Sequence, residues 1–154
     1  MDVGGSKAVA ARMAREAAEQ ARRAEIMNKI RELEREKEEC VSLRTGFEGK
    51  KLREKGISAA YYKAAMSGNE RRADDTLIPS DALQVKNMSG IEQPLEEMCP
   101  YIYETAVSPH LAAKLEGNPI SMECVLKNFN HVCQKYDYVT IEGSGGIVCP
   151  LRFA

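Results

Sequence analysis

The stretch that decides the fold is Tyr138-Val139-Thr140-Ile141-Glu142-Gly143-Ser144-Gly145-Gly146. Its first four residues are aromatic or β-branched, a composition typical of a β-strand. An apolar run of this length predicts a strand buried on both faces, as in a parallel sheet covered by helices. The carboxylate of Glu142 and a glycine-rich turn, 143–146, follow the end of that strand directly.

Outward from this stretch, short apolar runs alternate with segments of helical spacing. Residues 57–62 predict a second strand, which ends at Lys63, and 101–103 predict a weaker one. Helices are expected to begin near Ser80, to run from Ser108-Pro109 to Gly117, and to cover 122–133. Strands that alternate with helices predict an α/β fold with a mostly parallel sheet and flanking helices.

Polar residues follow the ends of two of these strands. Lys63, with Ser67 and Gly68 after it, follows one, and Glu142 with the glycine turn follows the other. Ligands of open α/β sheets bind beyond the carboxyl ends of the strands, so we expect these groups to converge on one edge. Glycines let backbone N–H groups approach a phosphate, a carboxylate there can hold Mg²⁺, and a lysine attracts an anionic substrate.

Each of these residues has a purely structural alternative. Taken singly, Lys63 is equally well explained as an exposed lysine, and 143–146 as a tight turn. Ser80 or Asp81 is placed to cap the helix that begins there. The expected convergence on one sheet edge favours the functional interpretation.

The residues before about Gly49 have a different composition. From Lys7 to Arg44 the chain lacks proline and glycine and is rich in Ala, Arg, Glu and Lys, which predicts a long helix. Ser6 is placed to cap its start, and Gly46 is expected to end it. We therefore expect two parts: a charged helix over 1–49 and an α/β domain over 50–154.

Apolar residues of the long helix have heptad spacing over a short stretch: Ile26, Ile30, Leu33 and Cys40. Two interpretations stay open. One is a partner-binding or dimerising helix, and the other is a solvated helix with charge pairs four residues apart.

Length and charge restrict the class of function. The chain has 154 residues and a net charge of −1, which gives no electrostatic reason to expect nucleic acid or an anionic membrane as partner. No apolar run approaches the roughly 20 residues that span a bilayer. Five cysteines without Cys-x-x-Cys spacing and two histidines disfavour a zinc site. With no apolar leader, we expect a cytoplasmic protein with reduced thiols.

Several motifs together resemble the dethiobiotin synthetase family in their order and spacing. They are Tyr62-Lys63-Ala64-Ala65-Met66-Ser67-Gly68, Ser80-Asp81-Ala82-Leu83, Ser108-Pro109-His110, Val139 to Gly146, and Pro150-Leu151. The resemblance covers about residues 50–153. The combination is far more specific than any single motif in it.

The resemblance implies a P-loop-type α/β fold, with only part of the sheet present here, and a homodimer. The family uses Mg²⁺ and ATP to close a ureido ring from carbon dioxide and 7,8-diaminononanoate. The substrate's carbamate takes up the γ-phosphoryl group, and the second amine then attacks the mixed anhydride. Such phosphoryl transfer depends on positioning and charge neutralisation.

Carried over by motif position, the resemblance also implies roles for individual residues. Lys63 would be catalytic and hold the carbamate and the transferring phosphoryl group, and Ser67 would bind substrate. Asp81 and Glu142 would coordinate Mg²⁺ and so bind the nucleotide. The substrate and phosphate side of the cleft would be lined by Gly143, Ser144, Gly145 and Gly146.

The chain departs from the family ahead of Lys63, where a first strand and a Gly-Lys-Thr phosphate loop are expected. That region, Glu36–Val41, belongs to the predicted helix. Residues 45–51 resemble a shortened phosphate loop, but the Gly-to-Gly-Lys interval is two residues too short. The chain also ends at Ala154, before segments that bind adenine in the family. We therefore expect exposed strand edges, marginal stability and negligible synthetase activity.

Two alternatives to a synthetase stay open. The first is a non-enzymatic interaction protein in which the long helix acts and the α/β part is an inactive remnant. The second is a nucleotide-dependent switch like the related deviant P-loop ATPases, which requires a phosphate loop that this sequence lacks.

Overall fold

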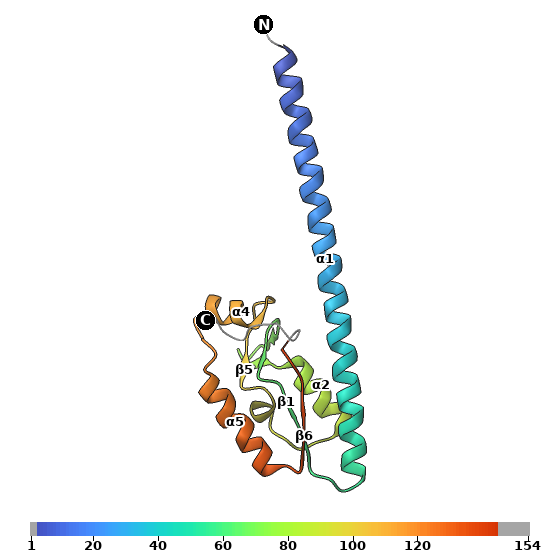
Figure 1. Cartoon of the computed structure of the whole chain (residues 1–154), viewed down its shortest axis with the longest axis vertical. Helices are drawn as coiled ribbons and strands as arrows, with labels where there is room; N and C mark the ends of the chain where they lie inside the picture. Colours follow the sequence, from blue (N-terminus) through green and yellow to red (C-terminus); the bar gives the residue numbers. More distant parts are fainter. Residues whose placement is uncertain (1–2, 145–154) are drawn as a thin grey trace. The chain divides into compact units, whose positions relative to one another are not determined.

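The structure is a computed structural model that describes residues 3–144 and, within the first helix, the side chains from residue 12 onward except 34, 38 and 39. The chain divides into two compact units, one up to Glu39 and one from Cys40 onward. A single helix, α1 (Val3–Glu54), contributes to both (Figure 1). No helix in the described part of the chain is both long and apolar enough to cross a membrane.

The long predicted helix is confirmed, and the first unit consists of its N-terminal part. Its side chains form ion pairs along the helix surface, such as Arg12–Glu16 at 3.0 Å and Glu19–Arg23 at 2.6 Å. Such pairs, four residues apart, stabilise a solvent-exposed helix. From residue 12 onward, the large apolar side chains described in this unit are exposed as well: Met13, Ile26, Met27, Ile30 and Leu33.

The expectation that the helix ends at Gly46 is wrong. The helix ends before Gly56, whose φ of +74° is accessible to glycine at little cost. The Gly56 N–H donates to the Arg53 carbonyl at 2.9 Å, and the Ile57 N–H donates to the Leu52 carbonyl at 3.1 Å. These two bonds satisfy two carbonyls in the last turn of the helix.

The glycines at 46 and 49 instead allow α1 to approach α2 (Ser80–Ser89) closely. A Cβ on Gly46 would lie 2.8 Å from the Met88 Cβ, and one on Gly49 would lie 3.0 Å from the Ser89 Cβ. Packing against α2 therefore outweighs the weak helix propensity of glycine. Residues 45–51 are helical throughout, so the resemblance to a shortened phosphate loop does not correspond to a loop.

The second unit contains short, mostly parallel strand pairs. β1 (Ala59–Tyr62) pairs in parallel with β6 (Tyr138–Ile141), β2 (Ala65–Met66) pairs in parallel with β5 (Tyr101–Ile102), and β3 (Glu70–Arg71) pairs antiparallel with β4 (Leu77–Ile78). The other helices are α3 (Leu95–Met98), α4 (Pro109–Leu115) and α5 (Met122–Lys135). The predicted α/β class with a mostly parallel sheet and flanking helices is confirmed.

Alternate residues of β1 face two separate hydrophobic clusters. Ala60 and Tyr62 pack with residues of α4 and α5, including Val125, whereas Tyr61 packs with residues of α2 and α3, including Val85. Figure 1 shows the same arrangement, with α5 and α2 on opposite sides of β1 and β6. A two-residue period in β1 therefore decides which side chains reach which layer.

The prediction that β6 is buried on both faces is wrong. Tyr138 is 47% and Ile141 is 61% exposed. Within residues 3–144, β6 pairs with β1 alone and so forms an edge of the sheet.

On the opposite edge of β1, a side-chain amide takes the place of a neighbouring strand. The Tyr61 N–H donates to Gln93 Oε1 at 2.8 Å, and Gln93 Nε2 donates to the Tyr61 carbonyl at 3.0 Å.

Candidate functional site

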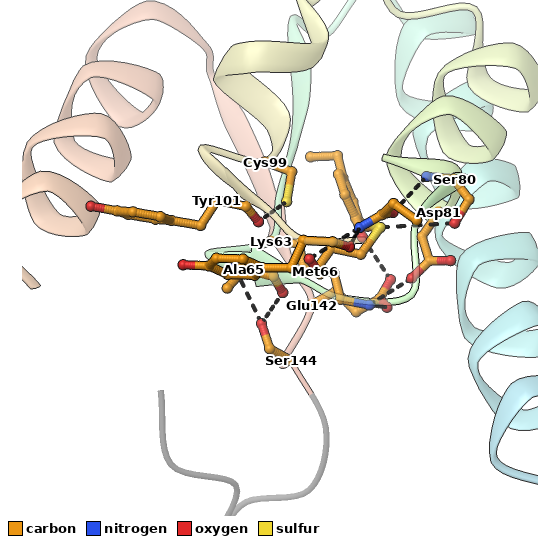
Figure 2. Close-up of polar contacts among 12 residues, drawn as sticks. Lys63, Ala65, Met66, Ser80, Asp81, Cys99, Tyr101, Glu142 and Ser144 are labelled. Carbon is orange, nitrogen blue, oxygen red and sulfur yellow. Dashed lines mark hydrogen bonds and ion pairs between the residues drawn. The ribbon is translucent and has the colours of Figure 1, made fainter. Parts of the chain in front are cut away.

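Three residues from the motifs meet at the carboxyl ends of β1 and β6 (Figure 2). The Lys63 Nζ donates to Asp81 Oδ2 at 2.7 Å and to Glu142 Oε1 at 2.7 Å. The side chains of Lys63 and Glu142 are only 4% and 7% exposed. One buried ammonium group therefore bridges two carboxylates.

The register of the two strands places Lys63 beside Glu142. Tyr62 lies opposite Ile141, so both charged residues come one position after the strand end. The Glu142 N–H donates to the Tyr62 carbonyl at 2.9 Å, which continues the pairing by one step. The expected convergence of these strand ends on one edge is thus present in the fold.

Asp81 reaches the group from the first turn of α2. The expectation that Ser80 or Asp81 caps this helix through its side chain is wrong: Pro79 is the N-cap residue, and no side-chain cap bond is formed. The Ser80 N–H donates instead to Asn69 Oδ1 at 3.3 Å. The Asp81 carboxylate is directed to Lys63, and its negative charge is favoured at a helix N-terminus.

Burial and neighbouring charges shift the pKa values of Lys63, Tyr61 and Cys99. Burial lowers the pKa of Lys63, but Asp81 and Glu142 outweigh burial and raise that pKa above its ordinary value. Burial, followed by the charge of Glu142, raises the pKa of Tyr61 far above its ordinary value. Burial also raises the pKa of the Cys99 thiol to about 12. At neutral pH the lysine is therefore charged, and the phenol and the thiol are neutral.

Ser67 does not join this charged group. Its hydroxyl donates to the Val107 carbonyl at 2.5 Å. Gly68 follows with a φ of +75°, and a Cβ there would lie 3.4 Å from the Ala106 Cβ. The turn therefore holds Ser67 against the loop before α4, and the hydroxyl would have to leave Val107 to donate to a substrate.

The segment after β6 is joined to β2 through Ser144. The Ser144 hydroxyl donates to the Ala65 carbonyl at 2.5 Å and accepts a bond from the Ala65 N–H at 3.3 Å (Figure 2). Gly143, between Glu142 and Ser144, is exposed. The predicted residues Gly145 and Gly146 lie outside the described residues, as does the Pro150-Leu151 motif.

Two residues that the motifs did not indicate complete the group. The Tyr61 hydroxyl donates to Glu142 Oε2 at 2.9 Å, and Gln93 holds the Tyr61 backbone as described above. The alternation of side chains along a strand places 61 and 63 on one face, a signal that could have indicated Tyr61. No sequence pattern marks Gln93, because its amide replaces a strand backbone only in the folded chain.

The two carboxylates fit a magnesium site. Mg²⁺ prefers oxygen ligands, and proteins commonly supply one or two carboxylates while water and substrate complete the coordination. Asp81 and Glu142 each place an oxygen 2.7 Å from the same Lys63 Nζ. Among residues 3–144, no group of three or more His, Cys, Asp and Glu side chains is placed to hold a metal.

Comparisons with known proteins agree with the motifs. Residues 50–152 match the family model AAA_26, described as an AAA domain. The ATP-dependent dethiobiotin synthetase BioD of Clostridium kluyveri is 50% identical over 100 residues, which are 65% of this chain and 41% of that protein. BioD of Clostridium botulinum is 54% identical over 102 residues, 66% of this chain and 44% of that protein. BioD of Clostridium novyi is 47% identical over 100 residues, 65% of this chain and 42% of that protein.

The chain spans about two fifths of the length of these curated relatives. The resemblance to dethiobiotin synthetase over about residues 50–153 is confirmed, whereas the residues before 50 lie outside the family match. Lys63, Asp81 and Glu142 all lie within the matched residues. Because that match covers well over half of the chain, the protein belongs to the AAA domain family AAA_26.

Proposed function

We propose that the α/β unit carries the carbamate-binding and magnesium-binding half of a dethiobiotin synthetase site. One observation supports this above all others: a buried ammonium group, Lys63, lies between Asp81 and Glu142 at the ends of two parallel strands. The similar proteins are ATP-dependent dethiobiotin synthetases, and the matched residues include all three side chains.

In this proposal the site assists transfer of a phosphoryl group to the carbamate of 7,8-diaminononanoate formed with carbon dioxide. Lys63 would face the carbamate and the phosphoryl oxygens and compensate their negative charge. Asp81 and Glu142 would hold Mg²⁺, which supplies further positive charge to ATP when bound. Ser67 and the turn 143–146 would contact the substrate, and the turn's backbone N–H groups suit an anion.

We also propose that this chain by itself closes the ureido ring at a negligible rate. Residues 40–54 are continuous helix, so their backbone N–H groups bond within α1. Phosphate loops depend on N–H groups that are free to point at the anion. Within residues 3–144, the positive charge for the ATP phosphates would come from Lys63 and the bound cation.

Calorimetric titration with the diamine, bicarbonate and Mg²⁺ tests the binding part of the proposal. We expect the chain to bind the diamine, and we expect Lys63→Met to lose that binding. Lys135→Met is the matched control, because Lys135 also lies 2.7 Å from a carboxylate, that of Glu97, but on the surface. Equal binding by the two variants contradicts the proposal.

Mass spectrometry of the product tests the catalytic part separately. The chain is incubated with diamine, bicarbonate and MgATP, and dethiobiotin is measured against a reaction without protein. We expect no product above that background. Steady product formation that Lys63→Ala abolishes would contradict the impairment and support a complete enzyme.

A second function, that of an interaction protein, is favoured by the exposed apolar residues of the first unit: Ile26, Ile30 and Leu33 at heptad spacing. The resemblance also implies a homodimer, and it agrees with a cytoplasmic location. Sedimentation equilibrium of the full chain and of Ile30→Glu tests self-association through the helix. A monomer at every concentration contradicts both the dimer and a self-associating helix, and cell fractionation tests the location.

A further inference from the structure

Two adjacent tyrosines of β1 differ in what their hydroxyl groups bind. Tyr61 and Tyr62 are both almost fully buried, at 1% and 3% exposure. The Tyr61 hydroxyl donates to Glu142 Oε2 at 2.9 Å, whereas the Tyr62 hydroxyl donates to the Val125 carbonyl of α5 at 2.9 Å. The Tyr61 hydroxyl therefore bonds to the charged group, whereas the Tyr62 hydroxyl bonds to the helix on the opposite face.

The position of the Tyr61 hydroxyl is fixed from two sides. Its backbone N–H and carbonyl are both bonded to the side-chain amide of Gln93, which is fully buried. Its ring lies in a cluster of buried side chains that includes Met66, Val85 and Met98. A ring held in this way presents its hydroxyl at one point beside Glu142.

The two oxygens of Glu142 have separate partners. Oε2 accepts the bond from Tyr61, and Oε1 accepts the bond from Lys63. Since Lys63 also donates to Asp81, Oε1 is the oxygen of Glu142 that lies on the side of Lys63 and Asp81. Rotation of the Glu142 carboxylate out of its present plane would break the Tyr61 bond, so this bond fixes the orientation of the carboxylate.

We propose that Tyr61 is a positioning residue that fixes the carboxylate of Glu142, so that one oxygen faces Lys63 and Asp81 while the other stays bonded to Tyr61. Tyr61 acts through Glu142 and touches neither substrate nor metal. Its neutral hydroxyl adds no charge that would compete with a cation. The link to metal binding rests on the proposed function, whereas the pairing of Tyr61 with Glu142 does not.

Binding of Mn²⁺ to the full chain, followed by electron paramagnetic resonance, tests this role with Mn²⁺ as the probe. We expect Tyr61→Phe to weaken Mn²⁺ binding about tenfold, the typical effect of losing a partner that orients a ligand. Tyr62→Phe is the matched control, because it removes a hydrogen-bonded hydroxyl from the next residue, which is almost fully buried as well. We expect it to leave Mn²⁺ affinity unchanged. Equal affinities of the Tyr61→Phe variant and the unaltered chain, or equal losses in the two variants, overturn the proposal.

A double-mutant cycle gives a second test that does not require a metal. Urea unfolding is measured for Tyr61→Phe, Glu142→Gln and the double variant. Each variant changes the unfolding equilibrium constant by some factor. We expect the factor for the double variant to differ by at least about twofold from the product of the factors for the two single variants. Additive losses overturn the pairing. If Mn²⁺ fails to bind the unaltered chain, the magnesium part of the proposed function fails, and the cycle then decides on Tyr61 alone.

Discussion

Replacement of Lys63 by methionine tests the charged group most directly. The variant keeps the length of the side chain and removes the charge that lies 2.7 Å from both Asp81 and Glu142. At an effective dielectric constant of about 20, each such contact corresponds to about 6 kcal/mol of attraction. Burial of the charges and repulsion between the carboxylates offset much of this. The expected net loss in the free energy of unfolding is about 3–5 kcal/mol, as for a buried charge that loses its partner.

Urea unfolding followed by tyrosine fluorescence measures this loss in the α/β unit alone. The chain has no tryptophan, and all six tyrosines lie between Tyr61 and Tyr138, so the first unit contributes no signal. Lys135→Met is the control, because its ion pair with Glu97 has the same 2.7 Å length on the surface. Solvent screens such a pair, and its loss is expected to be much smaller.

A second arm separates charge from packing. If the loss in Lys63→Met comes from two unpaired carboxylates, a further Asp81→Asn change should restore stability in that variant and lower it in the unaltered chain. Millimolar Mg²⁺ should stabilise the variant as well, by about 2.7 kcal/mol at a hundred times its dissociation constant. Equal losses in Lys63→Met and Lys135→Met, or a further loss with Asp81→Asn, would refute the reasoning.

Three further predictions use the same unfolding assay. Gly46→Ala should destabilise the α/β unit by about 1–3 kcal/mol, because the added methyl group overpacks against Met88 even though alanine favours helix. A further Met88→Ala change should remove most of that loss. Gln93→Ala should destabilise it by about 2–5 kcal/mol, because the N–H and carbonyl of Tyr61 lose their partners. Burial raises the pKa of the Cys99 thiol in the folded chain to about 12, so the thiol ionises at lower pH in the unfolded chain than in the folded one. The free energy of unfolding should therefore fall above about pH 8.5, by up to about 1.4 kcal/mol per pH unit. Cys99→Ala should make that fall shallower, and an unchanged slope contradicts the assignment.

Much of the candidate site could be predicted from local sequence. Lys63 and Glu142 each follow an apolar run, and parallel strands end at a common edge, so their convergence followed from strand periodicity alone. The role of Asp81 could not be predicted from strand periodicity. A carboxylate in the first turn of a helix serves as a cap or as an ion partner, and the position of Lys63 in space decides between them.

What the sequence by itself determined is the order of strands β1, β5 and β6 and of helices α1, α2, α4 and α5, together with the charged residues at the ends of β1 and β6. These depend on side-chain period and on neighbours along the chain, whereas the two-residue strands β2, β3 and β4 and the short helix α3 were not predicted. Only the tertiary structure decided that α1 continues past Gly46, since Met88 of another helix requires a residue without a side chain there. It also decided the exposure of Ile141, because burial of a strand depends on which elements pair with it and cover it. The amide of Gln93 serves as a strand partner for the same reason: contacts between residues distant in sequence exist only after the chain has folded.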